Sequence, residues 1–384
     1  MIGGESKLEN RPVFQLTYRA LLTLMVLTVF ACRVETIQPV PIAPITKEVA
    51  EGATRSYMMG FSSLPAALTE SAYLETYDIA SAHGEALLIQ RSPAWADFLP
   101  GAKISEQLRS QTLAQKNATS TRGLELIYVL DPFTPETRMG LHGLPDSHHG
   151  QTLSNIELRD ALVADALFVA RNFRPAYLVI GNEINVVFER DPKSYSEFVS
   201  VYSELYDAVK SAVPSVRVLT SFQYEEFLGV VPWLPSHTAR WNLLKDFEGR
   251  LDQFGITSYP SFAFTNARKI EPSYYEQIRD HTDLPIAFVS VGYASGAGRE
   301  GINSTTPAEQ RRYLQRLLED ADNLNISLLI WLIARDLSYL TTAPENLASE
   351  LGLHQADGTP KEAWDAWLKA YKRPYNLITS TDTQ

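Results

Sequence analysis

Two short stretches of this 384-residue chain carry the side chains best suited to chemistry. The first, Tyr177–Asn185 (YLVIGNEIN), is an apolar run that ends abruptly in Asn182 and Glu183. The second, Leu284–Tyr293 (LPIAFVSVGY), is a similar run that carries Ser290 near its end. An amide and a carboxylate at the end of a buried strand can bind a hydroxyl group and transfer a proton. We therefore expect Asn182 and Glu183 to take part in a catalytic or binding site.

The elements that must position these side chains form a regular series. Short apolar runs alternate with longer helical patterns from residue 57 onward, and the predicted strands are 57–61, 86–90, 124–130, 176–181, 216–221, 254–258, 285–290 and 327–332. The runs are continuous rather than alternating, which is typical of parallel strands covered on both faces. Eight such units, with no Gly-rich phosphate loop after any strand, favour a closed barrel over an open doubly wound sheet. We predict an α/β fold, a single (β/α)8 TIM barrel over residues 56–373.

Two helices are predicted with particular clarity. Tyr195, Phe198 and Tyr202 belong to a set of apolar residues at helical spacing after the fourth strand. Thr306-Pro-Ala-Glu309 has the pattern of a capping box with Pro at the first helical position, so a helix should begin there. The active face of such a barrel lies at the C-terminal ends of its strands, where Asn182 and Glu183 are expected.

Several of these stretches resemble the large clan of retaining glycoside hydrolases built on a (β/α)8 barrel. Gly181-Asn-Glu183 is similar to the clan's fourth strand, and the resemblance implies that Glu183 is the acid/base and Asn182 a substrate-binding amide. Ile256–Pro260 is similar to the sixth strand, which implies that Tyr259 lies beside the nucleophile. Leu329–Trp331 is similar to the eighth strand, whose Trp forms the floor of the sugar subsite. The resemblance thus implies a carbohydrate partner, sugar stacking on Trp331, Trp95 and Tyr293, and no cofactor.

The chain departs from the clan's pattern at Ser290. The seventh strand of the clan carries the nucleophilic Glu just before a short residue, Gly and an aromatic, and here Ser290 precedes Val291-Gly-Tyr293. A serine hydroxyl has no charge to oppose an oxocarbenium-like transition state. An inverting route would need a different base at a separation of about 6.5–9.5 Å instead of about 5–5.5 Å. The carboxylates near other strand ends are Asp131, Glu225, Glu226 and Asp336, and the sequence does not select one of them.

Two functions therefore stay open. The chain could be a glycoside hydrolase that attacks an extracytoplasmic poly- or oligosaccharide with Glu183 and a second carboxylate. Alternatively, it is a catalytically degenerate barrel that binds carbohydrate without cleaving it. Arg91 and Arg335, which follow the second and eighth strands, could bind an acidic sugar or form internal ion pairs. We expect no metal site, because adjacent residues such as His148 and His149 rarely converge on one ion.

The N-terminus predicts export. Arg11 and Arg19 precede an apolar run over residues 20–31, about the length of the hydrophobic region of a signal peptide. The run ends at Cys32, the sole cysteine, in a pattern that resembles a bacterial lipobox. We therefore predict a lipoprotein-type signal over residues 1–32, a membrane anchor on Cys32 and a linker over residues 33–55. The alternative is an ordinary signal peptide or a signal anchor, with Cys32 incidental.

The overall composition fits these expectations. The formal charge of −11 argues against nucleic acid as a partner, because proteins that bind nucleic acids carry basic patches. Hydrophobic residues make up 45% of the chain, which is ample for a core. Residues 374–384 are polar and are predicted to form a frayed tail.

Overall fold

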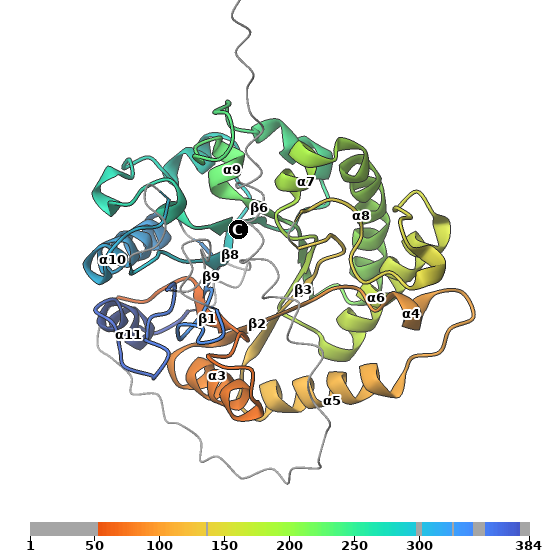
Figure 1. The fold of residues 1–384 in the computed structure, drawn as a ribbon, viewed down its shortest axis with the longest axis horizontal. Coiled ribbons are helices and arrows are strands. Elements are labelled where there is room, and N and C mark those ends of the chain that lie inside the picture. Colours follow the sequence, from red (N-terminus) through yellow and green to blue (C-terminus); the bar gives the residue numbers. More distant parts are fainter. Residues whose placement is uncertain (1–52, 136, 297–301, 325, 341–349, 377–384) are drawn as a thin grey trace, which may run out of the picture.

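The chain folds into a near-closed barrel of parallel strands surrounded by helices (Figure 1). The computed structural model describes residues 53–135, 137–296, 302–324, 326–340 and 350–376. The predicted signal segment, Cys32 and most of the linker and tail lie outside these residues. In the part of the chain that is described, no helix is both long enough and apolar enough to cross a bilayer.

The sheet contains nine described strands in the order β5-β4-β3-β2-β1-β9-β8-β7-β6, and all pairings are parallel. Each predicted strand is present, with its ends shifted by one residue at most, except that the fifth is divided in two. The strands are β1 Met58–Ser62, β2 Ala86–Arg91, β3 Glu125–Leu130, β4 Tyr177–Ile180, β5 Arg217–Leu219, β6 Ser221–Gln223, β7 Phe254–Ser258, β8 Ile286–Val291 and β9 Leu328–Trp331.

The barrel is completed at Thr220, the single residue between β5 and β6. β5 pairs with β4 and β6 pairs with β7, so the two ends of the sheet meet in consecutive residues of the chain. The Thr220 hydroxyl donates to the Gly181 carbonyl at 2.9 Å, and the backbone N–H of Ser221 donates to the same oxygen at 3.3 Å. These bonds hold the divided strand against the end of β4, where Glu183 follows.

Helices surround the barrel (Figure 1), and their ends follow local sequence signals. The Asp191 side chain caps α8 with Pro192 in its first turn. Thr306 caps α10 by accepting from the Glu309 N–H at 3.3 Å, where the sequence predicts that a helix begins. The helices are α3 Glu70–His83, α4 Trp95–Phe98, α5 Glu106–Ser120, α6 Ile156–Phe173, α7 Ile184–Arg190, α8 Pro192–Ala212, α9 Tyr224–Leu228, α10 Pro307–Asn323 and α11 Trp364–Lys372.

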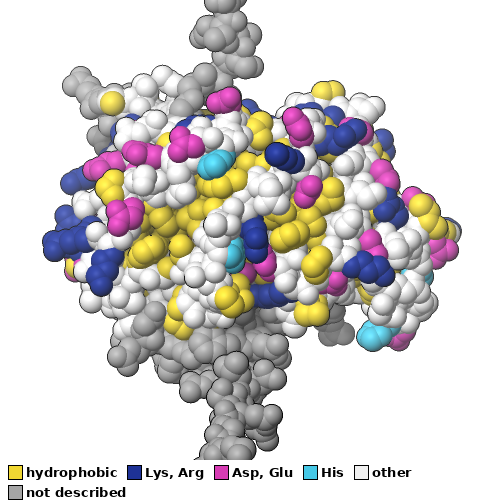
Figure 2. Space-filling model, turned by 90° about the horizontal axis from the view of Figure 1, so that it is seen from above, with side chains coloured by type: hydrophobic (Ala, Val, Ile, Leu, Met, Phe, Trp, Pro, Cys, Tyr) yellow, Lys and Arg dark blue, Asp and Glu magenta, His cyan; other side chains and the backbone are white. Residues whose placement is uncertain are grey.

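The strands form the core, and nearly all of their side chains are buried. The folded unit reaches to both predicted boundaries, because Arg55 is buried and its backbone N–H donates to the Pro374 carbonyl at 2.9 Å. The predicted linker and tail therefore each contribute residues to the barrel body. On the face seen in Figure 2, acidic and basic side chains are interspersed around a band of hydrophobic ones.

Candidate active site at the ends of β4, β7 and β8

Glu183 follows β4 and has an unusual backbone conformation. Its φ of 53° and ψ of 47° place it in the left-handed region, which non-glycine residues rarely adopt. Gly181, two residues earlier, has a φ of 70°, and a Cβ at this position would lie 2.6 Å from the Phe198 ring. Strained conformations of this kind cluster at functional sites, where the surrounding structure maintains them.

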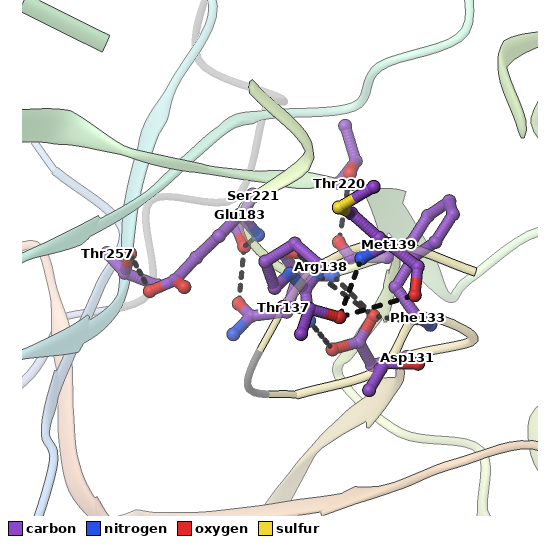
Figure 3. Close-up of polar contacts among 12 residues, drawn as sticks. Asp131, Phe133, Thr137, Arg138, Met139, Glu183, Thr220, Ser221 and Thr257 are labelled. Carbon is purple, nitrogen blue, oxygen red and sulfur yellow. Dashed lines mark hydrogen bonds and ion pairs between the residues drawn. The ribbon is translucent and has the colours of Figure 1, made fainter. Parts of the chain in front are cut away.

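The Glu183 side chain reaches across the end of the barrel to β7. Its Oε1 accepts a hydrogen bond from the Thr257 hydroxyl at 2.8 Å, and its backbone N–H donates to the Ser221 hydroxyl oxygen at 3.0 Å (Figure 3). The Ser221 hydroxyl in turn donates to Asn182 Oδ1 at 2.6 Å. Asn182 and Glu183 are therefore fixed by side chains of two other strands.

The environment of Glu183 favours its protonated form. Burial raises the pKa of this carboxyl to about 7, although the positive charge of Arg138 and the Thr257 hydrogen bond act in the opposite direction. The negative charges of Glu226 and Asp131 contribute smaller increases. A carboxyl that titrates near neutral pH can donate a proton to a leaving group, which is the task of a general acid.

Ser290 lies on β8 beside Thr257 of β7. The two residues are partners in the parallel register, after a shift between Ile256 and Thr257. The Ser290 hydroxyl is buried and lies 2.9 Å from the Tyr259 hydroxyl, so the two form a hydrogen-bonded pair. Burial raises the Tyr259 pKa above its usual range, and the charge of Glu183 raises it further. This side of the site therefore presents two neutral hydroxyls.

Most of the alternative carboxylates are already engaged. Asp131 forms a buried ion pair with Arg138 at 2.6 Å, and Asp336 pairs with Lys361 at 2.6 Å. The Glu225 carboxylate accepts four hydrogen bonds of 2.6 to 2.9 Å, from Gln223, Ser258, Tyr274 and the Tyr259 backbone. These contacts assign structural roles to the three carboxylates.

Glu226 differs from these three. Its Oε1 accepts from Trp233 Nε1 at 3.0 Å and lies 3.5 Å from the Arg190 guanidinium, whereas its buried Oε2 has no hydrogen-bond partner among the described residues. Burial raises its pKa, and Arg190 and Trp233 oppose that effect. Among the four alternatives, it combines an unsatisfied oxygen with an electrostatic influence on Glu183.

The three predicted sugar platforms are buried rings. Trp331 ends β9, is 0% exposed and donates from Nε1 to the Leu351 carbonyl at 2.7 Å. Trp95 donates to the His142 carbonyl at 2.7 Å, and Tyr293 donates to the Phe264 carbonyl at 2.5 Å while its ring stacks on Tyr313. Such inward bonds are what aromatic residues make when they pack in a core. Stacking on sugar stays a prediction for all three.

The remaining polar candidates are accounted for by neighbours. Arg91 pairs with Asp165, and Arg335 pairs with Glu75. His148 lies 3.0 Å from Glu157. Among the described residues, no group of three or more His, Cys, Asp or Glu side chains is placed to hold a metal ion.

Sequence reasoning missed several members of the site, among them Ser221, Thr257 and Arg138. Thr257 could have been found, because it lies two residues before Tyr259 and side chains two apart in a strand share a face. Arg138 lies in the long segment after β3 and is 0% exposed. Nothing in its local sequence distinguishes it from an exposed loop arginine.

Several solved structures have a similar fold. An exo-β-1,4-mannosidase from Opitutaceae bacterium strain TAV5 superposes with a TM-score of 0.61 at 15% identity, covering 86% of this chain and 62% of that one. A GH5_18 protein from Streptomyces cattleya, in complex with GlcNAc, gives 0.62 at 15% identity over 85% and 83% of the two chains. The chain therefore shares its barrel fold with these glycoside hydrolase structures.

Other matches agree with this assignment of the fold. A GH5_18 variant from Bifidobacterium longum, in complex with Manβ1-4GlcNAc, gives a TM-score of 0.60 at 13% identity over 83% and 80% of the two chains. This chain spans less than two thirds of the mannosidase. No protein-family model and no curated protein matches the sequence.

Proposed function

We propose that this chain is an exported, glycoside hydrolase-like barrel that binds an extracytoplasmic oligo- or polysaccharide and does not hydrolyse it by double displacement. One observation carries the proposal. Glu183, held in a left-handed conformation with a pKa near neutrality, shares the mouth of the barrel with a neutral Ser290–Tyr259 pair. The proton-donating half of a retaining site is present, and the charge of the nucleophilic half is missing.

The proposed roles follow from the contacts. Glu183 is the proton donor, and Asn182 directs its amide NH2 toward a sugar hydroxyl because Ser221 already occupies its Oδ1. Trp331 is the proposed floor of the subsite. Trp95 and Tyr293 are further proposed platforms, and the polar atoms of all three rings bond to backbone carbonyls.

A second candidate function is hydrolysis by inversion, with Glu226 as the base. The observation in its favour is the Glu226 oxygen that has no hydrogen-bond partner, on a carboxylate whose charge raises the pKa of Glu183. In an inverting enzyme, the second carboxylate activates a water instead of attacking the sugar. The variant E226Q should then abolish turnover, whereas D336N, which alters a carboxylate of the same barrel face, should not.

Binding can be tested with the sugars that the structural neighbours hold. We expect Manβ1-4GlcNAc or a longer oligosaccharide to bind the mature chain in calorimetry, and we expect E183Q and N182A to weaken that binding at least tenfold. The control is E125Q, at an exposed position at the start of β3. Release of aryl alcohol from activated aryl glycosides by the parent chain, lost in E183Q, would favour hydrolysis. Absence of both turnover and affinity would refute both functions.

The lipid anchor on Cys32 is a separate proposal, supported by the lipobox-like pattern before the sole cysteine. Growth with a fatty-acid analogue should label the full chain and not C32S. If both are labelled, or neither, the anchor is elsewhere or absent.

A further inference from the structure

A buried ion pair lies directly behind Glu183. Arg138 is 0% exposed and forms two bonds to the Asp131 carboxylate, at 2.6 and 3.2 Å. Removing one partner of a buried ion pair typically costs about 3–5 kcal/mol, whereas replacing both with apolar residues is often neutral. Stability alone therefore gives little reason to keep two charges at this position.

The pair contacts both backbone groups of Asn182. Asp131 Oδ1 accepts from the Asn182 N–H at 3.3 Å, and the second terminal nitrogen of Arg138 donates to the Asn182 carbonyl. The planar guanidinium is suited to this arrangement, because it can bond a carboxylate and a carbonyl from one rigid group. The residue before Glu183 is thus held on both sides by one ion pair.

The neighbouring peptide groups are held by other strands. The Gly181 N–H donates to the Leu130 carbonyl at 2.9 Å, and the Gly181 carbonyl accepts from Thr220. The Glu183 N–H donates to Ser221. A left-handed non-glycine residue costs about 1–3 kcal/mol and persists only where its surroundings hold it. The Arg138–Asp131 pair supplies the contacts to Asn182 in this arrangement.

We propose that Arg138 and Asp131 are positioning residues that fix the Asn182–Glu183 turn and set the charge beside the Glu183 carboxyl. The inference rests on the proposed function only in taking Glu183 as the working group of the site. The charges of the pair act on Glu183 with opposite signs: Arg138 lowers its pKa, and Asp131 raises it by a smaller amount. The two residues should therefore have opposite effects on the titration of Glu183.

The chain contains a matched control for loss of a buried ion pair. Arg91, at the end of β2, bonds to Asp165 of α6 with Nη1 to Oδ2 at 2.7 Å, and both residues are buried. Asp165 also accepts from the Ala94 N–H at 2.8 Å, so this pair holds a backbone group as well. The described contacts of the Arg91–Asp165 pair do not include residues 181–183. Arg91→Met therefore reports on general destabilisation.

The experiment is a carbon-13 NMR titration of glutamate-labelled protein, in which Glu183→Gln identifies the Glu183 signal. We expect the titration midpoint of Glu183 to rise by about one pH unit or more in Arg138→Met and to fall in Asp131→Asn. In Arg138→Lys, which keeps the positive charge, the titration midpoint of Glu183 should stay closer to the parent's than it does in Arg138→Met. Arg91→Met should leave the midpoint unchanged.

A second variant keeps the test possible if Arg138→Met fails to fold. If Arg138→Met does not fold, the double variant Asp131→Leu/Arg138→Met removes both charges together, and the midpoint should still rise because Arg138 has the larger influence. Shifts of the same sign in Arg138→Met and Asp131→Asn, or shifts no larger than in Arg91→Met, would overturn the proposal. The midpoint is measured without sugar, so failure of glycan binding would count against the proposed function and leave this inference standing.

Discussion

The end of β4 and the end of β8 supply the two halves of the candidate site, and they differ in charge and in strain. The β4 end carries an ionisable Glu183 in a left-handed conformation, supported by an ion pair and by hydroxyls from other strands. The β8 end carries a neutral Ser290 within a regular strand, bonded to a neutral Tyr259. Under the proposed function, the β4 end keeps what a proton donor requires, and the β8 end presents hydroxyls where a retaining enzyme would need a negative charge.

Placing a negative charge at the β8 end should give the largest effect. S290E should raise hydrolysis of activated aryl glycosides by about a hundredfold or more over the parent, because a carboxylate there can attack the sugar carbon while Tyr259 donates to it. Steady-state kinetics measures the gain. S290Q, which adds the size without the charge, should not show it, and S290E/E183Q should lose it. An inactive, folded S290E would mean that the two ends do not share one sugar.

Removing the charge at the β4 end should stabilise the fold at high pH. Because the folded pKa of Glu183 is raised from 4.5 to about 7, its contribution to stability is fully present below pH 4.5 and is lost as the pH rises to about 7. E183Q should therefore match the parent at pH 4 and exceed it by up to about 3 kcal/mol at pH 8, at ~1.36 kcal/mol per pKa unit. Urea unfolding at the two pH values, with E125Q as the control, tests this. If E183Q and the parent were equally stable at both pH values, the prediction would be contradicted.

Alanine substitutions at Gly181, beside the β4 end, and at Gly292, beside the β8 end, compare the backbone strain at the two ends. G181A must place a Cβ at a φ of 70° and 2.6 Å from Phe198, so it should destabilise the fold by about 2–4 kcal/mol. At Gly292, after β8, the nearest atoms to a Cβ lie at 3.4 Å, and G292A should cost less than about 1 kcal/mol. Chemical denaturation measures both. Similar costs would mean that the β4 end carries no special strain.

The smallest effect is expected from the hydroxyl pair. Y259F leaves the buried Ser290 hydroxyl without its partner and should cost about 1 kcal/mol. In Y259F/S290A both hydroxyls are removed, so the double variant should be no less stable than Y259F. A double-mutant cycle measures the coupling. Strictly additive costs would show that the pair contributes no interaction of its own.

Much of the fold could be predicted because the relevant signals are local. Continuous apolar runs located the strands, with β5 and β6 predicted as one, and Thr306-Pro307 identified the start of α10. The division of the fifth strand was not predictable, because it depends on bonds between Thr220 and Gly181, which lie 39 residues apart in the chain. The same holds for Arg138, whose partners Asp131 and Asn182 come from different strand ends.

The sequence by itself determined which groups stand at the strand ends: a carboxylate at 183, a hydroxyl at 290 and tyrosine at 259. Covalent order is enough for this, since each residue follows directly from the apolar run that places it. Only the tertiary structure decided which of these groups meet, that Glu183 is buried with a pKa near neutrality, and that Arg138 stands behind it. Burial and charge proximity depend on residues from distant segments, and they arise only when the barrel closes.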